Sequence, residues 1–554
     1  MRVFIVGGYG VFGGRLTRLL LRDGAQVCVA GRDLRKAQAF TCRYGGEAFQ
    51  LDVTGDLAPI LRAAPDVVVD AAGPFHAYDA DFYRLARFCI ANKIHYLDLS
   101  DDAAFVAGIA TLDAQAKAAE CIVLSGVSSV PAISSCAVAH LSKDLTAILL
   151  IETTILPDAG SPLGASVTAS ALAQIGAPLR IWRGGVWRQY TGWTEPKPAI
   201  LGPACTRATR LVNAPDVLLF PSVYRARSVI CRVGLERWVM NAGLAVFGYL
   251  RRKTGLRDLG WLAPLLIAVS KPFSRFSSGK SGMVVEVIGL KDEQPLRRRW
   301  QLTATKGQGS FIPALAARAA IRNCGCLAPG ARPLLADLTL PQIASAMAEL
   351  SITDTYAQAP APTLFQAALG DRWLQLPRSV QRLHSVQDRE SFSGRARVTR
   401  GRGLLARLAA WCFAFPTAAD DVELTLTKTQ TPRGEIWERD FAGRRFRSVL
   451  TASVRPWHYR ERFGALTYEQ ALPVENATLS FLVERGWFLG VPIPSFLLPR
   501  SCAKEFAVND HFHFDVGLYA PLTGELIVRY QGQVRPDAAG APGAASRDTS
   551  RVRR

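Results

Sequence analysis

The sequence is poor in closely spaced cysteines and in long uninterrupted apolar runs, and each shortage excludes a class of protein. Its 11 cysteines form no C-x-x-C pair, and the only close couple is Cys324 and Cys326. This spacing argues against a disulfide framework and against a zinc ribbon, and we expect no metal. Because Met1 to Val6 already read as a strand, we also expect no signal peptide, and a reducing cytoplasm fits best.

Lysine is scarce as well. Only 12 of the 66 basic residues are lysine, so arginine supplies most of the net charge of +20. Nucleic-acid binding would need a basic stripe interleaved with exposed aromatic residues, or a recognisable reading module. The sequence shows neither, so we expect no nucleic-acid partner. Attraction to anionic lipid or to phosphorylated ligands is the favoured use of the charge.

A glycine-rich turn at the N-terminus is the most informative motif. Gly8, Gly10 and Gly13 form a G-x-G-x-x-G array between a strand ending at Val6 and a helix predicted over Gly14 to Arg22. The glycines permit a tight turn, close approach of backbone to a pyrophosphate, and close packing of helix on strand. The positive end of the helix then faces the phosphates. The motif predicts dinucleotide binding, with a plain α/β turn as the alternative.

The end of the next strand, Gln26 to Ala30, indicates which dinucleotide is bound. NAD-selective folds place an acid there, but this chain has Gly31 followed by Arg32. A guanidinium pairs with a 2′-phosphate that a carboxylate would repel. NADP(H) is therefore favoured over NAD(H). In the alternative interpretation Arg32 belongs to a solvated helix start and Asp33 is its N-cap.

The following segments alternate between strand and helix, which implies a parallel, doubly wound sheet. Asp52 and Val53 come after a short third strand, and a turn of small residues follows the fourth strand, Asp66 to Asp70. Ligands of such sheets lie beyond the carboxyl ends of the strands. The residues expected to hold the dinucleotide are Gly7, Gly8, Tyr9, Gly10, Val11, Phe12, Gly13, Gly31, Arg32, Asp33, Asp52, Val53, Ala71, Ala72, Gly73 and Pro74.

The order of these segments resembles the saccharopine dehydrogenase-like NADP-binding family, including its lipid-associated oxidoreductase and trans-acting enoyl reductase branches. The resemblance depends on the glycine turn, the end of the second strand, the turn at 72–75, the stretch His95 to Ser100 and the loop Gly126 to Pro131. It covers about residues 1–340. It implies hydride transfer between a nicotinamide and a carbonyl, imine or enoyl carbon.

The protein needs a group that handles one proton in such a reaction. Proton donors near the predicted strand ends are His76, Tyr78, Tyr96, Asp98 and Ser100. We favour Tyr78 and His76 as catalytic residues, because Tyr96 suits the core and Asp98 suits a helix cap. No Ser-x-x-x-Lys or Tyr-x-x-x-Lys pair follows the fourth strand.

The middle of the chain contains an unusual apolar segment at 238–276. Val239 to Leu250 and Trp261 to Val269 are apolar, and Arg251-Arg252-Lys253 separates them. Neither half reaches the roughly 18 residues that span a bilayer. A hydrophobic lid or peripheral contact with the inner membrane face is one interpretation, and a buried core or homodimer element is the other.

Beyond residue 363 short alternating runs with turn signals predict antiparallel β structure, either a barrel or a strongly curved sheet. This part resembles a bacterial domain of unknown function of the DUF4166 type. In His511-Phe512-His513-Phe514-Asp515, period-2 geometry places both histidines and the acid on one face. We expect this polar face to line a pocket rather than to bind a metal.

The expected fold class is α/β: a Rossmann-type doubly wound sheet with an α+β substrate domain, followed by a mainly antiparallel β domain. The predicted divisions are an NADP-binding domain at 1–135, a substrate or dimerisation domain at 136–345, a linker at 346–363, a β domain at 364–536 and a disordered tail at 537–554. We predict an NADP(H)-dependent oxidoreductase acting on an apolar or lipid-like small molecule. The alternative is a non-catalytic NADP(H)-binding protein whose β domain binds lipid or a protein partner.

Overall fold

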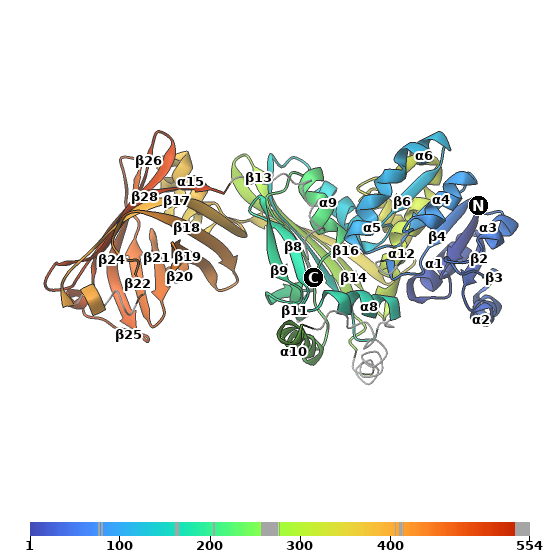
Figure 1. Ribbon diagram of the computed structural model, residues 1–554, viewed down its shortest axis with the longest axis horizontal. Coiled ribbons are helices and arrows are strands. Elements are labelled where there is room, and N and C mark those ends of the chain that lie inside the picture. Colours follow the sequence, from blue (N-terminus) through green and yellow to red (C-terminus); the bar gives the residue numbers. More distant parts are fainter. Residues whose placement is uncertain are drawn as a thin grey trace.

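The computed structural model describes residues 1–75, 78, 81–160, 165–202, 205–255, 275, 277–404, 406–408, 413 and 415–537, and of residues 165–167 only the backbone. Three parts follow one another along an elongated molecule (Figure 1). An α/β domain lies at one end, a mixed sheet with helices lies in the middle, and a β domain lies at the other end.

The first part is built on a seven-stranded parallel sheet in the order β15-β6-β5-β4-β1-β2-β3. The predicted Rossmann-type fold is thereby confirmed. The direction of strand progression reverses between β1 and β4, where such sheets bind ligands. The strands are β1 (Arg2–Val6), β2 (Gln26–Gly31), β3 (Glu47–Gln50), β4 (Val67–Asp70), β5 (His95–Asp98), β6 (Ile122–Ser125) and β15 (Gly330–Pro333).

Apolar residues explain why this sheet forms a core. Val67, Val68 and Val69 of β4 are fully buried, as expected for a parallel strand covered on both faces. The described helices along this stretch are α1 (Val11–Arg22), α2 (Leu34–Tyr44), α3 (Ala58–Ala63), α4 (Arg84–Ala91), α5 (Ala103–Gly108), α6 (Asp113–Ala118) and α7 (Ser134–Leu141). Strand β15 comes from far outside the predicted 1–135 domain and completes the sheet beside β6.

The middle part is a nine-stranded sheet in the order β10-β11-β12-β7-β13-β14-β16, with β8 and β9 branching from β12. Its strands are β7 (Ala147–Leu156), β8 (Pro178–Arg183), β9 (Val186–Thr191), β10 (Lys197–Ile200), β11 (Thr206–Leu211), β12 (Val229–Val233), β13 (Ser281–Lys291), β14 (Gln294–Ala304) and β16 (Ile352–Pro360). The helices along this stretch of the chain are α8 (Ala165–Gln174), α9 (Pro215–Val223), α10 (Trp238–Thr254), α12 (Ile312–Arg322) and α13 (Leu340–Met347); of these, α12 packs on α1 of the first part.

The predicted linker at 346–363 is wrong in its central part. Residues Ile352–Pro360 form β16, which pairs with β14 along its whole length. Within this pairing the Trp300 indole N–H donates to Asp354, at 2.9 Å. The strand lies at the edge of the sheet, and most of its side chains are exposed, so its small and polar composition resembled that of a linker.

Only part of the apolar segment at 238–276 lies within the described residues. Its first half is α10 (Trp238–Thr254), which ends at Gly255, while residues 256–274 and 276 lie outside the description. The predicted tail is likewise outside it from residue 538 onward. Among the residues described, no helix is both long and apolar enough to cross a membrane.

The third part is an antiparallel barrel, which confirms the predicted β domain. Strand pairing runs β22-β21-β20-β19-β18-β17-β28-β27-β26-β24, and β22 pairs with β24 to close the ring. These strands are β17 (Arg389–Arg400), β18 (Ala419–Thr431), β19 (Gly434–Phe441), β20 (Arg444–Ala452), β21 (His458–Phe463), β22 (Leu466–Ala471), β24 (Thr478–Phe488), β26 (Arg500–Val508), β27 (His511–Tyr519) and β28 (Leu526–Pro536). The short β23 (Val474–Glu475) and β25 (Val491–Pro492) pair with β24, and α14 (Leu364–Leu369) and α15 (Arg378–His384) precede the barrel.

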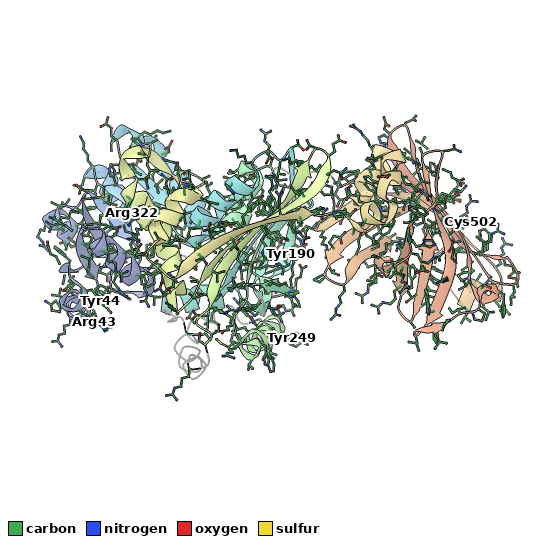
Figure 2. The ribbon with its side chains drawn as sticks, turned by 180° about the vertical axis from the view of Figure 1, so that it is seen from behind. Arg43, Tyr44, Tyr190, Tyr249, Arg322 and Cys502 are labelled. Carbon is green, nitrogen blue, oxygen red and sulfur yellow. The ribbon has the colours of Figure 1, made fainter. Side chains whose placement is uncertain are left out.

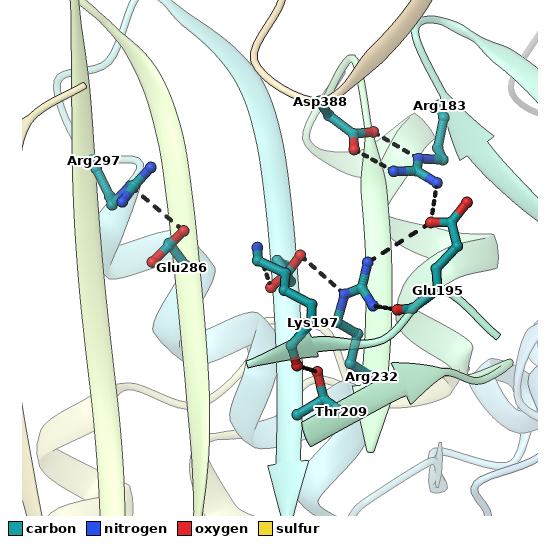
Figure 3. A network of polar contacts seen from close by, with 9 residues as sticks. Arg183, Glu195, Lys197, Thr209, Arg232, Glu286, Arg297 and Asp388 are labelled. Carbon is teal, nitrogen blue, oxygen red and sulfur yellow. Dashed lines mark hydrogen bonds and ion pairs between the residues drawn. The ribbon is translucent and has the colours of Figure 1, made fainter. Parts of the chain in front are cut away.

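Buried ion pairs join segments that lie far apart in the chain. The guanidinium of Arg318 on α12, 2 % exposed, donates to Asp23 at the end of α1 at 2.6 Å. Arg183 of β8 is equally enclosed, and its Nε donates to Asp388 of the barrel domain at 2.8 Å. Figure 3 shows how this contact continues through Glu195 to Arg232. The barrel is therefore tied to the middle sheet by charge pairing that solvent does not screen.

Candidate active site

The glycine turn at the end of β1 leaves no room for side chains. Gly7 has φ of 74°, and a Cβ on Gly13 would lie 2.3 Å from the Gly7 carbonyl oxygen. The helix α1 starts at Val11 after Gly10, with no side-chain cap and no acid in its first turn. Its N-terminal N–H groups are therefore not neutralised by a side chain, which suits the phosphates of a dinucleotide.

The end of β2 explains the missing acid. A Cβ on Gly31 would lie 2.5 Å from the Tyr9 ring and its hydroxyl oxygen, so the tyrosine ring excludes any side chain there. The Asp33 N–H donates to the Tyr9 hydroxyl at 3.2 Å and fixes the ring in place. Arg32 beside it is exposed. This edge thus offers a guanidinium and no carboxylate at position 31, which fits a 2′-phosphate.

Three of the predicted cofactor residues have structural partners of their own. Asp33 is the N-cap of α2, and its carboxylate accepts from the Lys36 N–H at 3.2 Å, so the N-cap interpretation is confirmed for this side chain. Asp52 accepts from the N–H and the hydroxyl of Thr54, at 3.0 and 2.8 Å. The Val53 carbonyl accepts from Arg84. Sequence analysis missed Arg84, which holds this loop from α4.

The turn after β4 carries a hydrogen-bonded pair of acid and phenol. The Tyr78 hydroxyl lies 3.1 and 3.0 Å from the two carboxylate oxygens of Asp70, and it donates to this group. Asp70 also accepts from the Ala72 N–H at 3.0 Å. Burial is the main cause that raises the pKa of Asp70 to about 6. Burial and the nearby carboxylate raise the pKa of Tyr78 far above its usual value, so the phenol stays protonated.

Asp98 lies beside Asp70 at the end of the neighbouring strand, in register with it, and neither side chain is exposed. One oxygen of Asp98 accepts from the Ser100 N–H, the Ser125 hydroxyl and the Gly126 N–H, at 3.0, 3.0 and 2.9 Å. The other oxygen is buried and has no hydrogen-bond partner among the described residues. Burial is the largest cause that raises the Asp98 pKa to about 7. Two buried carboxyls with raised pKa values thus lie side by side at the carboxyl ends of β4 and β5.

The predicted proton donors end up in different environments. The Tyr78 hydroxyl lies against Asp70 at the end of β4, whereas His76 falls outside the described residues. Tyr96 is buried in the core, as expected. Asp98 does not cap the next helix, because Asp102 accepts from the Phe105 N–H instead, at 2.8 Å. The predicted cofactor and catalytic roles stay predictions. Asp70 was missed, although an acid ending an apolar strand is a signal for it.

The polar face of β27 does not line the barrel cavity, so that prediction is wrong. The cavity is lined by Phe512 and Phe514 from the opposite face. On the outer face His513 stacks on Phe506, and Asp515 pairs with Arg529 at 2.6 Å. Within the described part of the chain, no group of three or more His, Cys, Asp or Glu is arranged to hold a metal.

Comparison with known proteins gives two domain matches. Residues 3–124 match the saccharopine dehydrogenase NADP binding domain, and residues 376–534 match a domain of unknown function, DUF4166. No curated protein matches the chain.

Among solved structures, saccharopine dehydrogenase (L-Glu forming) from Saccharomyces cerevisiae has 15 % identity over 65 % of this chain and 99 % of its own, with a TM-score of 0.45. A probable dehydrogenase from Thermotoga maritima has 11 % identity over 63 % and 93 %, with a TM-score of 0.32. Likenesses this weak carry no argument about function. The domain match together with the glycine turn shows instead that this chain is an NADP-dependent oxidoreductase, with a saccharopine dehydrogenase NADP binding domain at its N-terminus and a DUF4166 domain at its C-terminus.

Proposed function

We propose that the protein transfers a hydride between NADP(H) and the carbonyl, imine or enoyl carbon of an apolar substrate, with Tyr78 and Asp70 handling the proton. The observation that carries this proposal is the pairing of Tyr78 with Asp70 at the turn after β4, beside the switch point of the sheet. When bound, NADPH supplies the hydride from its nicotinamide ring.

The proton moves in two steps in the direction of reduction. The Tyr78 hydroxyl gives its proton to the substrate atom that gains negative charge, and protonated Asp70 returns a proton to the phenolate. The pKa of Asp70 is about 6, so this carboxyl is half protonated when the pH equals that value. As the pH rises further, fewer molecules hold the proton that Asp70 would return to Tyr78. General acid catalysis of this kind contributes about 10²- to 10⁴-fold in rate.

The apolar nature of the substrate is supported by α10. Trp238 is 76 % exposed and Val246 is 59 % exposed; Tyr249 lies on the same helix (Figure 2). Arg252 and Lys253 are exposed in its last turn. An exposed apolar helix face next to cationic residues suits the interface of an anionic bilayer, from which lipid-like substrates are drawn.

The test of catalysis is the Tyr78→Phe variant, assayed by NADPH oxidation with medium-chain aldehydes, ketones and enoyl thioesters. We expect turnover to fall about 100-fold or more while NADPH binding is unchanged. Tyr83→Phe is the matched control, because the Tyr83 hydroxyl donates only to the Phe105 carbonyl at 2.6 Å. Unchanged turnover in Tyr78→Phe would remove this residue from the mechanism. NADPH binding without turnover of any class would favour the non-catalytic alternative.

The membrane contact has its own test. The double variant Val246→Ser with Leu250→Ser is expected to reduce sedimentation with anionic vesicles, and Val454→Ser, 91 % exposed on the barrel domain, is the control. Equal sedimentation of both variants would exclude α10 as the contact.

A further inference from the structure

The barrel domain encloses a cavity of about 160 Å³, many times the space that one ordered water needs. Twelve of the 26 described residues that line it are aromatic, and among these 26 the side chains that carry a charge at neutral pH are Arg439, Glu461 and Glu505. A cavity dominated by aromatic side chains with a few converging polar groups is the usual form of a small-molecule site. We infer that this barrel binds one apolar molecule that carries an uncharged oxygen acceptor, a carbonyl or hydroxyl, as its head group.

One end of the barrel is closed. Helix α14 contacts β20 and β21, and α15 contacts β26 and β27. Phe365 of α14 packs on Tyr459 and Phe481, with ring centroids 5.4 and 6.2 Å apart. Below this layer the Lys428 ammonium pairs with Glu435 at 2.8 Å, and both side chains are buried. The ligand therefore enters from the opposite end.

The opposite end has an apolar rim. In Figure 1, β25 marks this end of the barrel and α15 the closed one. The loops at this end expose Leu489 by 75 %, Phe496 by 64 % and Leu522 by 78 %. Leu489 and Phe496 lie on either side of β25 in the connection from β24 to β26, and Leu522 lies in the connection from β27 to β28. The exposed apolar residues favour the entry of an apolar body, and the exposed Arg444 and Arg500 lie at strand ends on the same side of the barrel.

The polar groups inside the barrel define the head group. Glu461, 6 % exposed, accepts from the Tyr459 hydroxyl at 3.1 Å and from the Gln470 amide at 2.9 Å. Arg439 lies 3.4 Å from the same carboxylate and donates to Ser448 at 3.0 Å. This cation is therefore matched by an anion, and the cavity has no unpaired positive charge for a carboxylate ligand.

The hydrogen-bonding capacity that the cavity leaves free is that of neutral hydroxyl groups, which can donate as well as accept. The hydroxyls of Tyr468, Ser501 and Tyr530 line the cavity and form no hydrogen bond to other described residues. Burial raises the pKa of both tyrosines to about 12, so they remain donors. The remaining acid, Glu505, is held by His384 at 2.6 Å. These hydroxyls can bind a neutral oxygen head group, whereas a carboxylate or ammonium group would bury a charge that no unpaired charge in the cavity compensates.

The test uses the full chain and the neutral dye Nile red, whose fluorescence rises in an apolar cavity. We expect dodecanol and decanal to displace the dye, and dodecanoate and dodecylamine to need at least about tenfold higher concentrations, because an uncompensated charge is costly to bury. Ser501→Trp fills the cavity from β26 without removing a hydrogen bond, and is expected to abolish displaceable dye binding. Lys504→Trp on the same strand, exposed on its outer face, is the matched control and should bind normally.

A second variant keeps the inference falsifiable if Ser501→Trp fails to fold. Glu461→Gln removes the anion beside Arg439 and leaves the cation unpaired, so dodecanoate should gain at least about tenfold over dodecanol. Equal binding of dodecanoate and dodecanol to the unaltered protein would overturn the inference. So would dye binding in Ser501→Trp equal to that in Lys504→Trp, since the dye would then lie elsewhere, as on α10. None of these outcomes depends on hydride transfer.

Discussion

Replacing Asp98 by asparagine tests whether a buried carboxyl below the cleft is neutral at low pH and charged at high pH. The pKa of Asp98 is raised from its ordinary value of 3.8 to about 7. The folded protein therefore holds this proton more tightly than the unfolded chain does. Stability from this group is fully present below about pH 4 and is lost as the pH rises towards 7. At 1.36 kcal/mol for each pKa unit, the loss is on the order of 4 kcal/mol.

Asparagine suits this position because the three hydrogen bonds converge on one oxygen of Asp98. The amide oxygen keeps these acceptor contacts, and the NH₂ group takes the place of the oxygen without a partner. The variant is therefore expected to fold and to lack the pH-dependent loss. The free energy of unfolding of the variant minus that of the unaltered protein should therefore be larger above about pH 7 than near about pH 4.

The assay is thermal unfolding across this pH range, with and without NADPH. The transition that NADPH shifts upward belongs to the cofactor domain, because a ligand stabilises the state that binds it. Between acid and neutral pH the midpoint of this transition should fall in the unaltered protein. This fall should be larger than the fall in Asp98→Asn by roughly 10 °C. Parallel midpoints for the two proteins at every pH would refute the assignment of a raised pKa to Asp98.

Three further substitutions test other parts of the argument. Arg32→Ala should weaken NADPH binding about tenfold or more without affecting NADH, since charge-assisted contacts contribute about 1.5–3 kcal/mol; nucleotide fluorescence measures both. Burial raises the pKa of Asp23, but Arg318 and Arg322 outweigh it and lower the pKa to about 2. Asp23→Asn should therefore reduce the free energy of unfolding by about 2 kcal/mol at neutral pH and leave it unchanged near about pH 2. Thermal unfolding at the two pH values measures this. Arg183→Met leaves the Asp388 carboxylate buried and unpaired, and should destabilise the contact between the middle sheet and the barrel by about 3–5 kcal/mol. Faster proteolysis at this contact would report the loss. Arg395→Met is the control and should change little, because Arg395 pairs with Asp421 in an exposed position.

The parts of the fold that follow from local pattern could be predicted from the sequence. The strand Gly434–Phe441 is one of the predicted short alternating runs, because Trp437 and Phe441 alternate with polar residues and a turn signal stands at each end. The glycine turn and the strands β1, β2 and β4 follow from apolar runs punctuated by glycine. The strand β16 was missed because its pairing with β14 is formed by backbone groups, and its exposed side chains carry no periodic apolar signal.

The site itself depends on contacts that no local pattern contains. The neighbourhood of Asp70 and Asp98 arises from the register of two strands separated by a helix, and the pKa of each depends on that burial. The exclusion of side chains at Gly31 comes from Tyr9, 22 residues earlier in the chain. The absence of an acid at position 31 favours NADP(H) from the sequence alone. The contact between Tyr9 and Gly31, which leaves little room for a side chain there, is seen only in the structure.

The arrangement of the parts constrains how the two ligand sites work together. The cofactor domain and the barrel lie at opposite ends of the molecule with the middle sheet between them (Figure 1). A molecule held inside the barrel is thus remote from a nicotinamide bound at the carboxyl ends of β1 and β4. Arg183 and Asp388 join the middle sheet to the barrel through a buried pair, which opposes free rotation of one part against the other. A ligand common to both sites would therefore have to leave the barrel before it is reduced or oxidised, and the barrel does not form a wall of the active site.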